Sequence, residues 1–152
     1  MKVFPSLMAD ICKTGKTTSL VSRSIPILIR WAQSGVITNI YGDLIKELGM
    51  ARFSGIGYSL GCIEDVISVM RKELNEKIPT LNALVHGKDG LPSYGFSYVY
   101  AEYDSYPTEV KLALVNEENS RAIKYDFEKK MQAILLAIGT DNVRHNRDIW
   151  RI

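Results

Sequence analysis

The sequence has few of the residues that form disulfides, metal sites or membrane spans. Its only cysteines, Cys12 and Cys62, are far apart and form no CxxC pattern, and its only histidines, His86 and His145, are isolated. This excludes a disulfide framework and the usual metal-ligand spacings. No apolar run approaches the roughly 18–20 residues that a membrane span needs, and the first residues show no signal-peptide pattern. We therefore expect a cytoplasmic protein with no metal, no cofactor and no contact with membranes.

The 152 residues suit one domain, and the 46% hydrophobic and 24% charged residues are typical of globular chains. The net charge of +2 is too small to indicate nucleic-acid binding by itself. Residues 1–46 carry six basic and two acidic side chains, whereas residues 100–152 carry eight basic and nine acidic ones. A modestly basic N-terminal part fits a phosphate-facing surface, and random scatter explains it equally well.

The stretch KTGKTTS at 13–19 resembles part of a phosphate-binding loop, but Asp10 stands where the loop requires its first glycine. We interpret residues 1–22 instead as a basic N-terminal segment that lies along DNA.

Three helices are expected in the first half of the chain. Residues 24–35 have an apolar face at helical spacing, with Ser24 as a cap and Pro26 in the first turn. A short helix follows Thr38 and ends at Gly49, which suits a left-handed C-terminal position. A longer helix begins after Ser54. Its apolar positions are Leu60, Ile63, Ile67, Met70 and Leu74.

The pattern changes over residues 78–99, IPTLNALVHGKDGLPSYGFSYV. Two β-prone runs flank the Asp89-Gly90 pair, which predicts a β-hairpin. Helical periodicity returns from Pro107 to about Ile138. The predicted fold class is therefore α+β, with a winged helix-turn-helix core over residues 23–101 and a helical C-terminal extension over 102–152, in one domain.

Residues 28–96 resemble the C-terminal DNA-binding domain of O6-alkylguanine-DNA alkyltransferases and alkyltransferase-like proteins. The resemblance rests on four stretches in the family's order: ITNIYGDLIKELG, ARFSGIGYSLG, IPTLNALV and DGLPSYGF. They cover a little under half of the chain, and each motif alone is weak. The resemblance implies that the protein binds duplex DNA, with one nucleotide rotated out of the helix.

In that family a tyrosine and an arginine help to rotate the nucleotide, and the matching positions are Tyr41 and Arg52. Ser54 and Gly55 would offer backbone N–H groups to a phosphate. The remaining predicted DNA contacts are Tyr58, Asn82, Lys88, Tyr94 and Arg30. The alternatives are structural: a half-buried tyrosine, solvated cations, a tight turn, and an asparagine that braces the fold by a hydrogen bond.

The chain departs from the family at the active-site segment. Thr80 stands where the family has its nucleophilic cysteine, and Leu81 and Asn82 stand where it has histidine and arginine. A threonine hydroxyl without a neighbouring base is a poor nucleophile. We therefore expect no alkyl transfer and no catalytic residue.

Two other functions remain open. The chain could be a nuclease or toxin domain that uses Asp141, His145 and Asp148. It could also be a protein-interaction module, since the aromatic run Tyr98, Tyr100, Tyr103 and Tyr106 suits a docking surface and the C-terminal helices could form a homodimer.

Overall fold

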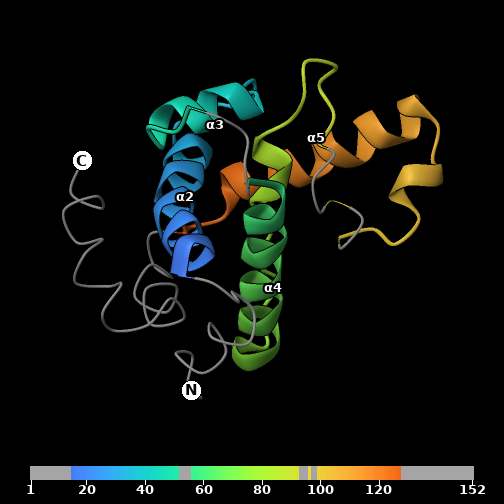
Figure 1. The fold of residues 1–152 in the computed structure, drawn as a ribbon. Coiled ribbons are helices and arrows are strands. Elements are labelled where there is room, and N and C mark those ends of the chain that lie inside the picture. The colour runs from blue at the N-terminus through green and yellow to red at the C-terminus, as the bar shows by residue number, and fades with distance from the viewer. Residues whose placement is uncertain (1–14, 52–55, 93–95, 97–98, 128–152) are drawn as a thin grey trace.

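The computed structural model describes residues 15–51, 56–92, 96 and 99–127. This part of the chain is built from helices and short 3₁₀ turns (Figure 1). Their bounds are α2 Gly15–Gln33, α3 Tyr41–Glu47, α4 Ile56–Leu74, η1 Asn82–Leu84, η3 Tyr103–Ser105 and α5 Thr108–Lys124. None of these helices combines the length and apolarity needed to cross a bilayer.

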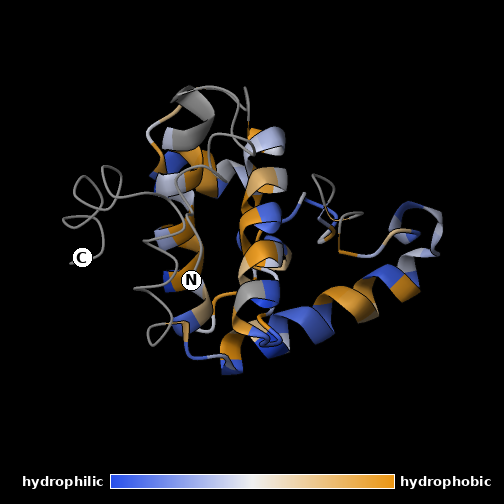
Figure 2. Ribbon diagram, turned by 90° about the horizontal axis from the view of Figure 1, so that it is seen from below, coloured by the Kyte–Doolittle hydropathy of each residue, from blue (hydrophilic) through white to orange (hydrophobic). Residues whose placement is uncertain are grey.

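Helices α2 and α4 lie side by side and form the most extensive contact between elements, and α3 lies across one end of the pair (Figure 1). Helix α5 contacts α2 and η1 with its later turns, while its first turns extend beyond the bundle. Both α2 and α4 have a hydrophobic and a hydrophilic face (Figure 2). The main core is therefore helical and encloses the residues around η1.

Helix α2 begins earlier than its sequence pattern predicts. The prediction that Ser24 caps the helix and that Pro26 lies in its first turn was wrong, because the helix begins at Gly15 and Pro26 lies in its interior. An interior proline removes one helical hydrogen bond. Burial of the apolar face, which includes Val21, Ile25 and Leu28, offsets that loss.

Helix α3 is short because of the residues at its two ends. The Ile40 N–H donates a 2.9 Å hydrogen bond to the Asp43 carboxylate, so Ile40 precedes the first turn rather than the expected Thr38. At the other end Gly49 adopts a φ of +69°, the left-handed conformation expected of it. The prediction for the C-terminal end of this helix is confirmed.

Helix α4 confirms the predicted apolar stripe. Leu60, Ile63, Ile67 and Met70 are all fully buried, and Leu74 at the end of the helix is half-buried. Asn75 follows with a positive φ of 49°, and Pro79 lies beyond the end of the helix as expected.

The prediction of an α+β fold with a β-hairpin wing was wrong. In the described residues the 78–99 region contains no strand, and its one ladder contact is an isolated parallel bridge between Ile40 and His86. Residues 80–85 are consecutively buried, whereas a wing strand would alternate between buried and exposed positions. The Asn82 N–H also donates to Thr80 Oγ1 at 3.2 Å, which favours a turn over an extended strand.

The turn inside this region was predicted correctly. Gly90 has a φ of +82° and its N–H donates to the Gly87 carbonyl at 3.0 Å. The predicted helix after Pro107 is also confirmed as α5. Of the apolar residues Phe127, Met131, Ile134, Leu135 and Ile138, which carry the later part of that predicted helical periodicity, only Phe127 lies in the described residues, and it is buried.

Candidate functional site

A cavity of about 650 Å³ lies where the ends of α4 and α5 approach the segments 77–79 and 99–100. Its charged lining residues are Arg71, Lys77, Glu118, Arg121 and Lys124. The tyrosines Tyr100 and Tyr125 line it as well. The lining therefore carries four cations against one carboxylate.

The cations gather here because two helices end here. Arg71 lies in the last turn of α4, and Arg121 and Lys124 lie in the last turn of α5. Positive side chains are favoured at helix C-termini because the free carbonyl groups there carry partial negative charge. Lys77 joins them from the segment after α4. The preference of helix C-termini for basic residues therefore explains three of the four positive charges that line the cavity.

Glu118 is the buried polar group of the cavity, and the residue is only 6% exposed. The Tyr100 hydroxyl donates to its Oε1 at 3.0 Å, and Arg121 Nη1 donates to the same oxygen at 2.5 Å. Burial and the bond to Glu118 raise the pKa of Tyr100. The bond to Glu118 also raises the pKa of the Arg121 guanidinium. Glu118 Oε1 is therefore held between two donors.

Arg71 forms the wall between the cavity and the core. Its Nε donates to the Ile78 carbonyl at 2.6 Å, and its Nη1 donates to Glu64 Oε1 at 2.7 Å. Glu64 is only 1% exposed, and its other oxygen accepts a 2.6 Å hydrogen bond from the Thr80 hydroxyl. The guanidinium is thus fixed in position by two independent partners.

Thr80 has a carboxylate neighbour that the sequence pattern did not indicate. Both Thr80 and Glu64 are buried, and the Glu64 carboxylate is already paired with Arg71. Asn82, also buried, donates from Nδ2 to the Leu60 carbonyl on α4 at 2.8 Å. This contact is the bracing hydrogen bond given above as the structural alternative for Asn82.

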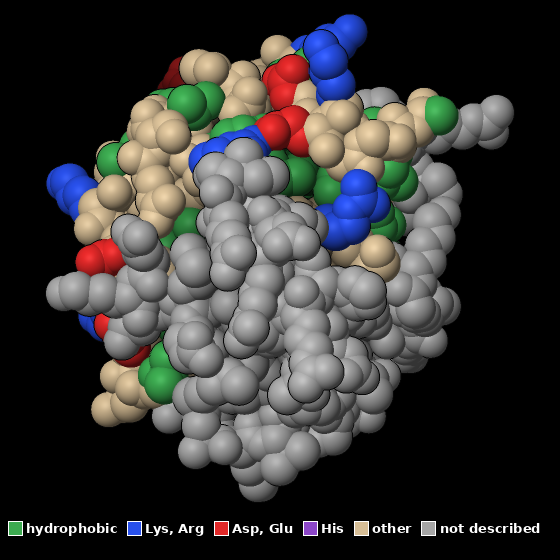
Figure 3. All heavy atoms as spheres, turned by 90° about the vertical axis from the view of Figure 1, so that its left-hand side faces the viewer, with side chains coloured by type: hydrophobic (Ala, Val, Ile, Leu, Met, Phe, Trp, Pro, Cys, Tyr) green, Lys and Arg blue, Asp and Glu red, His purple; other side chains and the backbone are tan. Residues whose placement is uncertain are grey.

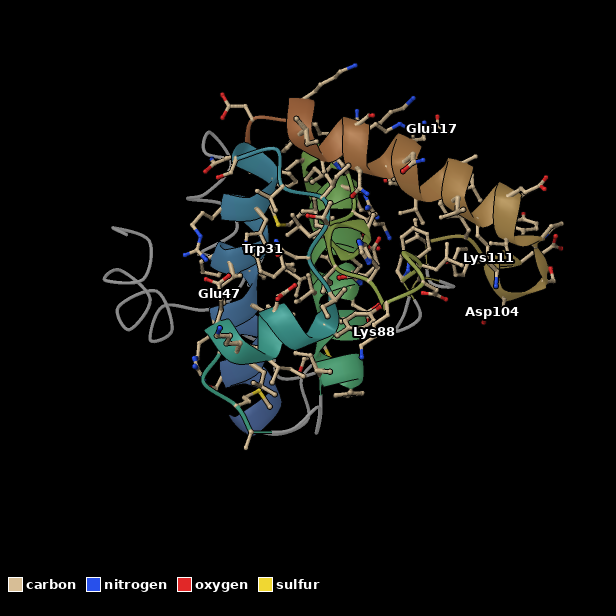
Figure 4. All side chains as sticks on the ribbon, turned by 90° about the horizontal axis from the view of Figure 1, so that it is seen from above. Trp31, Glu47, Lys88, Asp104, Lys111 and Glu117 are labelled. Atoms are coloured by element: carbon tan, nitrogen blue, oxygen red, sulfur yellow. The ribbon has the colours of Figure 1, made fainter. Side chains whose placement is uncertain are left out.

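The predicted DNA contacts do not share one surface in the described residues. Arg52, Ser54, Gly55 and Tyr94 lie outside those residues. Tyr41 and Asn82 are buried, and Arg30 is paired with Glu47. Tyr58 is 51% exposed on α4, and Lys88 is exposed at the 87–90 turn (Figure 4).

Residues were also predicted from the sequence for two alternative functions, a nuclease or toxin domain and a protein-interaction module. Asp141, His145, Asp148 and Tyr98 lie outside the described residues. Tyr103 is buried and donates to the Pro92 carbonyl at 2.9 Å, and Tyr106 is half-buried. Among the described residues of the aromatic run, Tyr100 lines the large cavity.

A second cavity of about 470 Å³ lies between the 87–92 turn, η3 and the start of α5. Its charged residues are balanced, with Lys88 and Lys111 against Asp89 and Asp104 (Figure 4). The described side chains on the side of the molecule seen in Figure 3 include both basic and acidic groups. Of the two cavities, the larger one has the more one-sided charge.

The chain matches no protein-family model, no curated protein and no solved structure. Within the residues that the structure describes, no group of three His, Cys, Asp or Glu side chains could hold a metal ion. The candidate site therefore rests on its own geometry, and the resemblance to alkyltransferases stays a prediction.

Sequence reasoning missed Arg71, Lys77, Glu118, Arg121 and Lys124. The sequence did contain a signal for Arg71, Arg121 and Lys124, because basic residues are typical of the last turn of a helix. That the ends of α4 and α5 meet around one cavity follows from tertiary packing.

Proposed function

We propose that the protein binds DNA without chemical catalysis, and that the cavity between α4 and α5 receives one unpaired or extruded nucleotide with its phosphate. The observation that carries the proposal is the lining of the cavity. Four cations, two tyrosines and one buried carboxylate surround a space of about 650 Å³. Pockets that hold small ligands usually measure about 300–1,000 Å³.

The cations supply the phosphate-binding part of the site. Lys77 and Lys124 are exposed, and neither forms an ion pair with a described carboxylate. Their ammonium groups are therefore free to turn toward a phosphate. Arg71 and Arg121 are paired with carboxylates, which fixes their guanidinium groups in position beside the lysines. Lysine and arginine contacts of this kind supply much of the affinity of proteins for DNA.

The tyrosines suit the base of the same nucleotide. Tyr100 and Tyr125 line the cavity, and both are half-buried, so part of each side chain stays accessible. Bases stack on aromatic side chains with a gain of about 1–3 kcal/mol each. An unpaired base is the fitting ligand because a base inside the duplex cannot enter a concave site.

The binding test uses fluorescence anisotropy with three labelled probes at low salt. They are a paired duplex, the same duplex with one unpaired nucleotide, and a single strand. We expect the two probes with unpaired bases to bind more tightly than the paired duplex. The double variant Lys77→Ala/Lys124→Ala should weaken their binding at least tenfold because it removes two phosphate contacts.

The matched control is Lys46→Ala/Lys72→Ala, which removes the same charge from two exposed lysines outside this cavity. It should change the affinity by less than about threefold. Equal losses in the two double variants would show that net charge, and not the cavity, determines binding. No binding of any probe would overturn the proposed function.

A further inference from the structure

The geometry of Glu118 points to selection among bases: we infer that the cavity prefers a base with an exocyclic amino group, such as cytosine, over thymine. The inference rests on the DNA-binding function proposed above. It is drawn from a separate observation, which is the distribution of the hydrogen bonds of the described residues between the two carboxylate oxygens of the buried Glu118.

Both hydrogen bonds to Glu118 end on the same atom. Tyr100 Oη and Arg121 Nη1 each donate to Oε1, at 3.0 Å and 2.5 Å. A carboxylate oxygen has two lone pairs, so these donors occupy Oε1. Oε2 is then the acceptor that remains for a ligand in the cavity. Because Glu118 is buried, a ligand donor there meets little competition from bulk water.

The negative charge at this point is not cancelled by Arg121. The guanidinium pairs with Glu117 through Nη2 and with Glu118 through Nη1, so one cation serves two carboxylates. The middle of α5 therefore favours a hydrogen-bond donor, whereas Lys124 favours an anion. Glu118 and Lys124 are six positions apart on α5, which corresponds to about 9 Å along the helix axis. The cavity thus has one region for a donor and another for a phosphate.

A nucleotide with an amino-bearing base matches both regions. Cytosine presents its N4 amino group as a donor, and carboxylates accept from that group in other DNA-binding proteins. Thymine presents the O4 carbonyl at the same place, and the like partial charges of O4 and a carboxylate repel each other. Its N3–H is flanked by two carbonyl oxygens, which lie close to any carboxylate that approaches it. Cytosine and thymine are otherwise similar in size and stacking surface.

The experiment compares two duplexes that differ only in one extrahelical base, cytosine or thymine, at pH 8 and low salt. Anisotropy titrations of the wild-type protein should give about tenfold tighter binding to the cytosine probe, the factor expected for one hydrogen bond to a charged group. Glu118→Gln should bring the ratio of the two dissociation constants close to one, because the amide can present N–H to O4 as readily as it presents oxygen to N4.

The control variant is Tyr100→Phe, which removes one donor on Oε1 and keeps the carboxylate. It should keep the preference for cytosine even where both affinities fall. Equal binding of the two probes by the wild-type protein would overturn the inference and leave the DNA-binding proposal intact, and so would a preference that survives in Glu118→Gln. If the wild-type protein binds neither probe, the proposed function fails and this inference fails with it.

Discussion

The hydroxyl of Thr80 donates a 2.6 Å hydrogen bond to Oε2 of Glu64, and both residues are buried. Oε1 of the same carboxylate accepts from Arg71 at 2.7 Å, so Glu64 satisfies two donors from different parts of the chain. The pair joins α4 to the buried segment that precedes η1. It also anchors the arginine that lines the large cavity.

Replacing Glu64 should therefore destabilise the fold strongly. Glu64→Ala leaves Arg71 without its carboxylate and Thr80 without its acceptor, and we expect a loss of about 3 kcal/mol in the free energy of unfolding. Urea denaturation followed by circular dichroism measures it. Glu117→Ala, which breaks an exposed ion pair with Arg121, should cost no more than about 0.5 kcal/mol. Similar losses in the two variants would contradict the assigned role of Glu64.

Two glycines around α3 should respond in opposite directions to alanine. Gly49 has a φ of +69°, so Gly49→Ala is strained even though the added Cβ meets no atom within 4 Å. We expect a loss of about 1 kcal/mol. Gly42 lies inside the helix, and a Cβ there would meet Ile40 at an ordinary 3.7 Å. Gly42→Ala should raise the stability by about 0.5–1 kcal/mol, and thermal melting of the two variants compares them directly.

Tyr103 should make the fold sensitive to alkaline pH. Burial is the main cause that raises the pKa of its hydroxyl from 10.0 to about 12. Between those values the unfolded chain loses the phenol proton while the folded chain keeps it, so the free energy of unfolding falls as pH rises. The stabilisation is complete below pH 10, and the total loss by pH 12 is about 2–3 kcal/mol.

The measurement is the free energy of unfolding of the wild type and Tyr103→Phe from pH 9 to pH 12. The variant lacks the hydrogen bond to Pro92 and should be less stable at pH 9. Its stability should decline less steeply with pH than that of the wild type. Tyr58→Phe, at a position that is 51% exposed, is the control and should follow the wild type. Parallel curves for all three proteins would contradict the prediction.

Salt should reveal how many phosphates the cavity region contacts. If Lys77 and Lys124 each neutralise one phosphate, their double alanine variant should reduce the slope of log K against log salt by about 1.4–1.8. Lys46→Ala/Lys72→Ala should leave the slope nearly unchanged. Titrations between about 50 and 200 mM salt measure both slopes. A slope near zero for the wild type would indicate binding through an apolar surface instead.

The parts of the fold that could be predicted from sequence are those that local chemistry determines. Gly49 marks a helix end because of its backbone freedom, and the apolar positions of α4 repeat at helical spacing. The 80–85 segment, TLNALV, could not be assigned in this way, because a short, mostly apolar run fits a strand and a buried turn alike. Asn82 was the residue in that run that disfavoured a strand, and it brings its side chain to α4.

The candidate site was less predictable because its residues come from distant positions. Arg71 and Arg121 are 50 positions apart in the sequence, and the packing of α5 on α2 and η1 brings them to one cavity. The burial of Glu118 also depends on that packing, since a lone glutamate on a helix is ordinarily solvated. Charge counts along the sequence contain no information about such a convergence.

The burial of residues 80–85 bears on chemistry as well as on packing. Thr80 has no exposed surface, so a cysteine placed at that position would be shielded from any reagent in solution. Such a thiol would also lie beside the Glu64 carboxylate, which disfavours the thiolate that nucleophilic attack requires. A reactive side chain placed at position 80 would therefore not create a reactive site. Here accessibility limits reactivity more than the identity of the residue does.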